Sequence, residues 1–174
     1  MKKTCSVLSA GFGIMTRPTD NSIPQGIKEG RPFAVDNEAF TQGFDPDAFF
    51  PYLEKLAPYR EQCLFAVVPD VVADAPATLR RFKRWANTIR DMGFPVAFVA
   101  QDGQEGLELP RDEDFTDYCY ENLGGIDDLA FYETLTAWER ETLSFDALFV
   151  GGSTDWKMGQ DAALCIQRAR RLGL

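Results

Sequence analysis

Four short apolar runs at similar intervals constrain the fold of this chain more than any other feature. The runs begin at Pro32, Leu64, Val96 and Ala147, and each ends in a polar residue or a glycine pair. Uninterrupted apolar runs of this length are typical of parallel strands that are buried on both faces of a sheet. The polar residues that follow the first three runs lie 34 and 31 residues apart, which fits a repeated strand, helix and two short loops. The runs therefore predict alternating strands and helices.

Three helical segments are predicted between and after these runs. Asp74 is expected to cap a helix that has Pro76 in its first turn and that closes at Gly93. Residues 45–56 and 160–172 carry two further helical patterns. Each of these helices follows one of the apolar runs, as a strand-and-helix repeat requires.

Three other segments are expected to depart from this pattern. Residues 16–31 are rich in proline and glycine, so we expect an irregular loop that is long enough to act as a lid or a binding loop. Residues 104–144 are acidic and aromatic and extend the interval before the fourth run, so we interpret them as an insertion with one helix at 131–143. The opening residues imitate the charged start of a signal peptide, but serines and glycines interrupt them, and we interpret them as a first strand.

The alternation predicts one α/β domain that spans residues 1–174, and it allows two architectures. One is an open, doubly wound sheet, and the other is a (β/α)₈ barrel of the TIM type. A complete barrel needs about 200 residues or more. Only five convincing strands are present, so a barrel, if this is one, would be shortened or partial at its C-terminal end. Both architectures bind ligands at the carboxyl ends of their strands.

The composition excludes several classes of function. The chain contains no histidine, which excludes Ser-His-Asp and Cys-His catalysis and zinc sites that need an imidazole, so acid and base chemistry falls to carboxylates. Its four cysteines lie 46 or more residues apart, so we predict no thiolate metal cluster, no disulfide framework and a cytoplasmic location. We also predict no metal site and no cofactor. No apolar run approaches the roughly 20 residues of a membrane-spanning helix, so no membrane partner is expected.

Polar groups follow each predicted strand, where side chains from separate strands converge on one pocket. They are Asp36, Asp70, Gln101 and the pair Gly151-Gly152. A carboxylate can accept hydrogen bonds from the ring N–H and the exocyclic amine of guanine, and an amide or backbone N–H can donate to its carbonyl. The set is therefore suited to reading a purine edge. The alternative is that Asp36 and Asp70 cap the following helices, which is weaker for Asp70 because Asp74 already does so.

Four segments carry a resemblance to a known family. They are Ala34-Val35-Asp36-Asn37-Glu38-Ala39-Phe40, Val68-Pro69-Asp70-Val71-Val72-Ala73-Asp74-Ala75, Val99-Ala100-Gln101-Asp102-Gly103 and Phe149-Val150-Gly151-Gly152-Ser153-Thr154-Asp155-Trp156-Lys157. They are similar to successive motifs of the queuine/archaeosine tRNA-guanine transglycosylase superfamily. They are closest to its phage and bacterial branch, which exchanges guanine in DNA for a 7-deazaguanine. The resemblance covers residues 30–103 and 145–172.

The resemblance implies a (β/α)₈ barrel and a base exchange that needs no metal. A carboxylate attacks the anomeric carbon of a guanosine, guanine leaves, and a 7-deazaguanine such as 7-cyano-7-deazaguanine takes its place with the same stereochemistry. By matching position, Asp36 resembles a general acid/base beside the sugar, Asp70 the aspartate that reads guanine, and Gln101 the glutamine that reads the base carbonyl. Gly151 and Gly152 resemble the loop whose backbone amide meets the base. DNA is then expected ahead of tRNA, in the host cytoplasm if the chain is phage-encoded.

Three features depart from the family pattern. The family places its nucleophilic aspartate on a later strand that does not occur before Leu174. The chain is therefore a fragment or a shortened relative, its activity has been lost, or a homo-oligomer or partner chain completes the barrel. Glu38 stands where the branch has glycine, and if it faces the pocket it would raise the pKa of Asp36 or act as a second carboxylate. The insertion at 104–144 has no counterpart and is expected to gate the substrate or bind a partner.

The formal net charge of −9 opposes binding to a polyanion, so the placement of basic residues matters. The basic run at residues 80–90 is expected to face solvent. Lys157 is the better phosphate contact because it follows the glycine pair near a helix start. Trp156 is expected either to stack on the base or to pack in the core.

Two alternatives to base exchange follow from the same residues. One is a catalytically silent module or subunit that binds guanine or a deazapurine but lacks the nucleophile. The other is a hydrolytic N-glycosidase that uses Asp36 or Glu38 with water.

Overall fold

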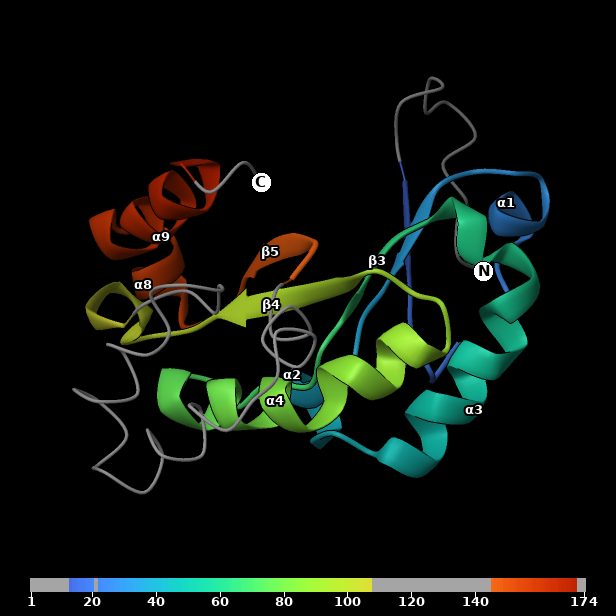
Figure 1. Ribbon diagram of the computed structural model, residues 1–174, viewed down its shortest axis with the longest axis horizontal. Coiled ribbons are helices and arrows are strands. Elements are labelled where there is room, and N and C mark those ends of the chain that lie inside the picture. Colours follow the sequence, from blue (N-terminus) through green and yellow to red (C-terminus); the bar gives the residue numbers. More distant parts are fainter. Residues whose placement is uncertain (1–12, 21, 108–144, 172–174) are drawn as a thin grey trace, which may run out of the picture.

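The computed structural model describes residues 13–20, 22–107 and 145–171, in which strands and helices alternate (Figure 1). The five strands of these ranges are β1 (Ile14–Thr16), β2 (Phe33–Val35), β3 (Cys63–Val67), β4 (Val96–Ala100) and β5 (Ala147–Val150). The α-helices in the same ranges are α1 (Gln25–Lys28), α2 (Ala39–Gln42), α3 (Pro46–Leu56), α4 (Ala75–Asp91), α8 (Thr154–Lys157) and α9 (Gln160–Arg171). Two 3₁₀ segments, η1 (Ala57–Gln62) and η2 (Gln104–Gly106), follow α3 and β4. None of these helices has both the length and the apolarity needed to cross a membrane.

The strands form one sheet in which every neighbouring pair is parallel and the order is β1-β2-β3-β4-β5. Each strand lies beside the strand that precedes it in the chain, and the carboxyl ends of all five share one edge. The pairing of β4 with β5 runs from Ala97 opposite Ala147 to Ala100 opposite Val150. The predicted α/β class is therefore confirmed. The described strands show no reversal of order, whereas a doubly wound sheet contains one.

Helix α4 forms as its sequence predicts. The Asp74 carboxylate accepts a hydrogen bond from the Ala77 N–H (2.8 Å) and so caps the first turn. After the helix, Gly93 adopts a φ of +84°, a conformation that residues other than glycine rarely adopt. The predicted apolar positions are all buried: Leu79, Phe82, Ala86 and Ile89. The helices predicted at 45–56 and 160–172 correspond to α3 and α9.

The expectation of an irregular loop over residues 16–31 is wrong at two places. Thr16 is the last residue of β1, and α1 spans Gln25–Lys28. Ile27 is fully buried in the apolar core, which anchors this short helix in a segment whose proline and glycine content suggests only a loop. The strand predicted in the opening residues and the helix predicted at 131–143 lie outside the described residues, as does most of the insertion.

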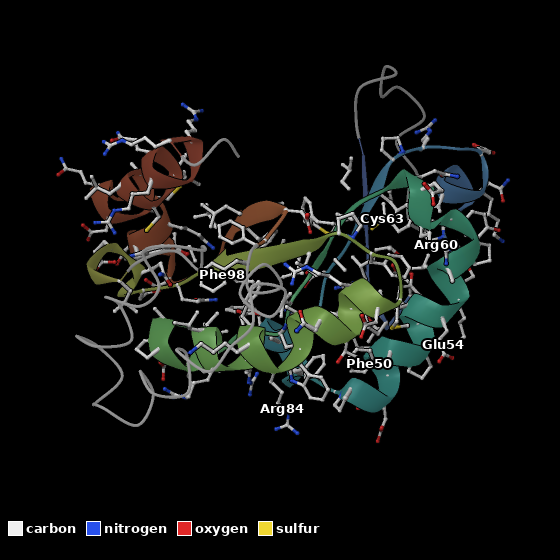
Figure 2. The ribbon with its side chains drawn as sticks, viewed as in Figure 1. Phe50, Glu54, Arg60, Cys63, Arg84 and Phe98 are labelled. Carbon is white, nitrogen blue, oxygen red and sulfur yellow. The ribbon has the colours of Figure 1, made fainter. Side chains whose placement is uncertain are left out.

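The main apolar core is formed by residues of the sheet and of the helices α3 and α4, which lie at an angle to each other (Figure 1). The ring of Phe82 on α4 meets Phe98 on β4 edge-on, with ring centroids 5.2 Å apart, and Phe145 lies 5.7 Å from Phe98. Figure 2 shows Phe98 on β4. Burial of one such ring stabilises the fold by about 1.5–3 kcal/mol. This packing fixes the strands whose ends carry the predicted site residues.

Candidate functional site

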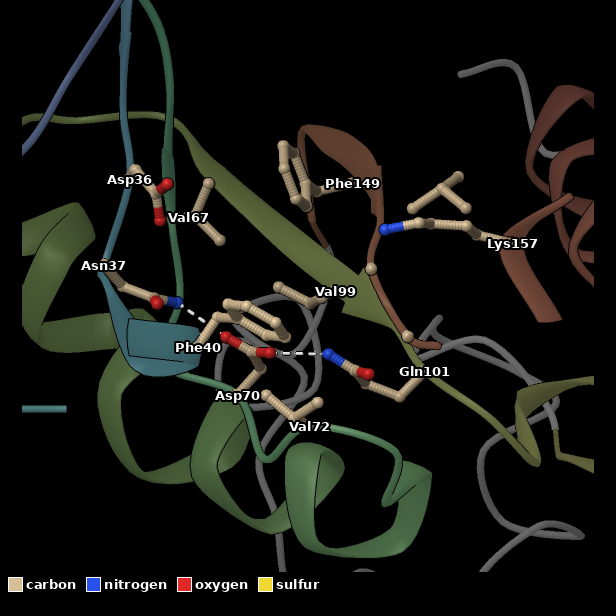
Figure 3. Close-up of a pocket in the computed structure, with 13 residues that line it drawn as sticks. Asp36, Asn37, Phe40, Val67, Asp70, Val72, Val99, Gln101, Phe149 and Lys157 are labelled. Atoms are coloured by element: carbon tan, nitrogen blue, oxygen red, sulfur yellow. Dashed lines mark hydrogen bonds between the residues drawn. The ribbon is translucent and has the colours of Figure 1, made fainter. Parts of the chain in front are cut away.

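A cavity of about 240 Å³ opens at the carboxyl edge of the sheet, where the segments after β2, β3, β4 and β5 meet (Figure 3). Its lining combines polar and apolar side chains: Asp36, Asn37, Phe40, Val67, Asp70, Val72, Val99, Gln101, Phe149, Val150, Gly151, Gly152 and Lys157. Six of the seven predicted site residues therefore lie together, and Trp156 is the one outside the lining. The common edge of the parallel strands brings these distant positions to one place.

Asp70 lies in this cavity with 8% of its surface exposed. Its Oδ1 atom accepts a hydrogen bond from Asn37 Nδ2 (2.9 Å), and its Oδ2 atom accepts one from Gln101 Nε2 (2.5 Å). Burial raises the pKa of the Asp70 carboxyl, and the nearby charge of Asp36 adds to this rise, while the bonds from Asn37 and Gln101 oppose it. Asp74 caps α4, so Asp70 is not a helix cap. A carboxylate offers about four acceptor positions, so Asp70 can accept further bonds from a ligand.

Asn37 holds Asp70 from the side of β2, and sequence reasoning missed this role. Its side chain is 4% exposed. The Nδ2 group donates to the Val68 carbonyl (3.0 Å) as well as to Asp70, and Oδ1 accepts from the Ala39 N–H (2.7 Å). The available signal was a polar residue directly after a buried strand, next to a residue already chosen as a candidate.

Gln101 is held so that its amide nitrogen faces Asp70. The side chain is 1% exposed, and its Oε1 atom accepts a hydrogen bond from the Ala73 N–H (3.0 Å). Ala73 has a φ of +59°, a left-handed conformation that is uncommon for residues other than glycine. Because the oxygen is occupied by a backbone donor, the nitrogen is the atom available to Asp70. Its second N–H can serve a ligand.

The glycine pair allows β5 to approach β4 closely. A Cβ atom at Gly151 would lie 2.7 Å from Val99 Cγ1 and 2.8 Å from Gln101 Nε2. A Cβ atom at Gly152 would lie 2.6 Å from Asp102 Oδ2, and this residue has a φ of +79°. Contacts this short require something to move, so both positions need glycine. The pair therefore forms a wall of the cavity that depends on the absence of side chains.

A second contact joins the segments after β4 and β5. Asp102 Oδ2 accepts a hydrogen bond from the Ser153 N–H (2.7 Å), and Asp102 Oδ1 accepts one from Ser153 Oγ (2.6 Å). These bonds lower the pKa of the Asp102 carboxyl. Ser153 Oγ also accepts from the Trp156 N–H (3.4 Å) at the start of α8. The contact ties the glycine pair to the loop that follows β4.

Asp36 and Glu38 point in different directions. Asp36 is half-buried, lines the cavity, and accepts a hydrogen bond from the Glu38 N–H at Oδ1 (3.0 Å). Because α2 begins at Ala39, Asp36 forms a local turn and is not the cap residue itself. The Glu38 carboxylate accepts from the Thr19 N–H (3.1 Å) and from Thr19 Oγ1 (2.5 Å), and it does not line the cavity. The two roles considered for Glu38 at the pocket are therefore not supported.

Two large side chains border the cavity, and a third packs elsewhere. Phe40 on α2 lines the cavity with 80% of its surface exposed, and sequence reasoning did not select it. Lys157 on α8 is exposed and lies on the β5 side of the lining (Figure 3). Trp156 is 8% exposed, packs in a cluster with Ala100, and donates from Nε1 to Glu105 Oε2 (2.7 Å). Of its two expected roles, Trp156 therefore shows the packing role.

The cavity offers buried acceptors, an amide donor and an exposed ring, which is suitable chemistry for a flat heterocycle with N–H groups and a carbonyl. Over the described ranges, no group of three or more His, Cys, Asp or Glu side chains is placed to hold a metal ion. No protein-family model, curated protein or solved structure matches this chain.

Proposed function

We propose that the cavity binds guanine or a 7-deazaguanine and that the chain takes part in exchanging this base in DNA. The observation that carries the proposal is the Asp70 carboxylate, buried between the amides of Asn37 and Gln101. The ring N–H and the exocyclic amine of guanine would donate to Asp70, and the second N–H of Gln101 would donate to the base carbonyl. A ligand without these donors would leave the buried Asp70 oxygens without bonds from the ligand, which costs binding free energy. The cavity would therefore select for a base that carries both donors.

Two further groups support a flat ligand. The exposed ring of Phe40 offers a face on which a base can stack. The Gly151 N–H donates to the Ala100 carbonyl (3.0 Å), so the amide of Gly152 is the one that we assign to the ligand. Lys157 would contact a phosphate of the polymer at the mouth of the cavity.

The proposed reaction uses carboxylates alone. A carboxylate displaces the base at the anomeric carbon, the glycosidic bond breaks, and Asp36 protonates the leaving guanine. Asp36 then accepts a proton from the incoming 7-deazaguanine as this base displaces the carboxylate from the same carbon. In the described ranges, Asp36 and Asp70 are the only carboxylates that line the cavity, so the displacing group would come from other residues or from a partner chain. The sequential strand order supports a partial (β/α) barrel as the scaffold.

That shortage of carboxylates also favours the second candidate, a binding module without turnover. Both oxygens of Asp70 already accept hydrogen bonds, which fits recognition better than attack on a sugar. A hydrolytic N-glycosidase remains the third candidate, with Asp36 activating a water molecule.

One experiment separates the three candidates. The chain is incubated with labelled 7-cyano-7-deazaguanine and duplex DNA, and in parallel with tRNA, and the label in the polymer is counted. Incorporation into DNA supports exchange, release of free guanine without incorporation supports hydrolysis, and calorimetric base binding without either supports the module. Failure of the chain to bind guanine or the deazapurine contradicts all three.

Variants at Asp36 test its role as the acid. Asp36→Asn should abolish incorporation and keep base binding, because the amide cannot deliver the proton. Asp91→Asn is the matched control, since Asp91 is an exposed carboxylate at the end of α4.

A further inference from the structure

Side chains of helix α4 form hydrogen bonds with the backbone of the segment that carries Asp70. Arg81 Nη1 donates a hydrogen bond to the Asp70 carbonyl oxygen (2.6 Å). One turn earlier, Thr78 Oγ1 accepts from the Val71 N–H (2.9 Å) and donates to the Val71 carbonyl (3.0 Å). The backbone of two consecutive residues is therefore fixed by side chains of the helix that follows.

Arg81 differs from Arg80 and Arg84 on the same helix. Arg80 is exposed, and Arg84 lies over the Trp85 ring with its guanidinium 4.8 Å from the ring centroid, pointing away from the sheet (Figure 2). Arg81 is half-buried and reaches the loop after β3. The expectation that the whole basic run faces solvent is therefore wrong for Arg81, and it is also wrong for Lys83 and Arg90, which are half-buried as well. The reason for Arg81 is its position two turns after the Asp74 cap, on the side of α4 that faces the site loop.

The bond from Arg81 complements the bonds to the Asp70 side chain. Asn37 and Gln101 fix the two carboxylate oxygens, and Arg81 fixes the main chain of the same residue. A hydrogen bond from a guanidinium is charge-assisted, and such bonds are shorter and stronger than bonds between neutral groups. Without it, the Asp70 backbone would depend on the bonds of Thr78 to the next residue.

We propose that Arg81 is a positioning residue that sets the affinity and the base selectivity of the cavity by fixing the main chain of Asp70. This inference rests on the proposed function, because it presupposes that Asp70 reads a guanine-type base. Arg81 does not line the cavity, so its effect must pass through Asp70. Misplacement of the carboxylate by a fraction of an ångström lengthens its bonds to the base amine and ring N–H together.

The test compares guanine with hypoxanthine, which lacks the exocyclic amine, by calorimetry on the full chain. Arg81→Met removes the donor at similar side-chain length, Arg81→Lys keeps a cationic donor, and Arg80→Met is the matched control on the exposed neighbour. Arg81→Gln supplies the same comparison if Arg81→Met does not fold. Circular dichroism and urea denaturation report the folded fraction of each variant.

The expected result is that Arg81→Met weakens guanine binding about tenfold and reduces the preference for guanine over hypoxanthine, because both depend on the placement of Asp70. Arg81→Lys should restore most of the affinity, and Arg80→Met should match the wild type. If Arg81→Met lowers only the folded fraction, the binding stoichiometry changes but the ratio of the guanine and hypoxanthine affinities does not. That outcome overturns the proposal. If Arg81→Met binds guanine with the affinity and selectivity of the wild type, the proposal is overturned too. If the wild type itself does not bind guanine, the proposed function is refuted.

Discussion

The amide nitrogen of Gln101 lies 2.5 Å from Oδ2 of Asp70, so side chains that follow two adjacent strands share a hydrogen bond inside the cavity. Both groups are nearly excluded from water, with 1% and 8% of their surfaces exposed. A buried carboxylate that is not protonated requires such donors, because burial without them disfavours the charged form. The pair therefore links the stability of this edge of the sheet to the base binding that we propose for the cavity.

Replacing Asp70 by asparagine should weaken guanine binding. The new amide would place donor hydrogens against Asn37 and Gln101 and remove an acceptor for the base. A hydrogen bond to a charged group contributes about 1.5–3 kcal/mol, so we expect a loss of about tenfold or more in affinity. Isothermal titration calorimetry measures it, with Glu54→Gln on the exposed side of α3 as the control. An unchanged dissociation constant in Asp70→Asn would mean that this residue does not read the base.

The pH dependence of unfolding should reveal the buried carboxyl of Asp70. Its folded-state pKa is raised by burial, so its contribution to stability is greatest below the ordinary Asp pKa of about 3.9 and is lost as the pH rises through the raised value. Urea denaturation across this acidic range should show the loss in the wild type. Asp70→Asn should lack this component, and identical pH profiles for the two proteins would contradict the assignment.

Asp102 should show the opposite pH dependence. Its pKa is lowered by the bonds from Ser153, so its contribution is present above the ordinary Asp pKa and is lost as the pH falls through the lowered value. Asp102 is only half-buried, so solvent screening keeps the effect small. A double-mutant cycle with Asp102→Asn and Ser153→Ala, measured by urea denaturation near neutral and acidic pH, should give a coupling energy that decreases on acidification. A coupling that grows with acid would refute the described contact.

Gly151→Ala should damage both stability and binding. The added methyl group would lie 2.7 Å from Val99 Cγ1 and 2.8 Å from Gln101 Nε2, so it must displace one of them. Overpacking of this kind typically lowers the free energy of unfolding by about 1–3 kcal/mol. Gly106→Ala is the matched control, because a Cβ there meets no atom within 4 Å. Equal denaturation midpoints for the two variants would show that the close approach is not needed.

Phe40→Ala should lower base affinity with little effect on stability. The ring is 80% exposed, so the fold loses little buried surface when it is removed. Stacking of one base on an aromatic ring contributes about 1–3 kcal/mol, which corresponds to about 5-fold to 150-fold in affinity. Calorimetry with guanine measures the loss, and Leu64→Ala, at an exposed position outside the cavity lining, is the control. If both variants bind guanine like the wild type, a stacking role for Phe40 is refuted.

The sequence was sufficient to predict β2, β3, β4 and β5 and the meeting of distant residues at one edge. β4 and β5 begin and end where the apolar runs do, because continuous burial on both faces leaves a plain apolar signal. Asp36, Asp70 and Gln101 lie together because parallel strands place their carboxyl ends at one edge. These predictions depend on the spacing of the apolar runs along the sequence and not on the conformation of any loop.

The remaining features depend on contacts that no local pattern records. Glu38 turns away from the cavity because Thr19, which is 19 residues earlier, offers two donors to its carboxylate. Arg81 lies in a run of similar basic residues, and only the path of the loop after β3 distinguishes it. Asn37 directly follows a buried strand, which is a weak signal, and Phe40 has no separate signal; the roles of both depend on the geometry of the turn into α2.

The sequential order of the strands has a consequence for biosynthesis. A nascent chain that has left the ribosome as far as residue 107 already contains Asn37, Asp70 and Gln101 together with their strands. β5 and the glycine pair, which form the opposite wall of the cavity, are translated only later. Vectorial synthesis thus produces Asn37, Asp70 and Gln101 before β5 and the glycine pair, so we expect these side chains to stay open to water until β5 docks.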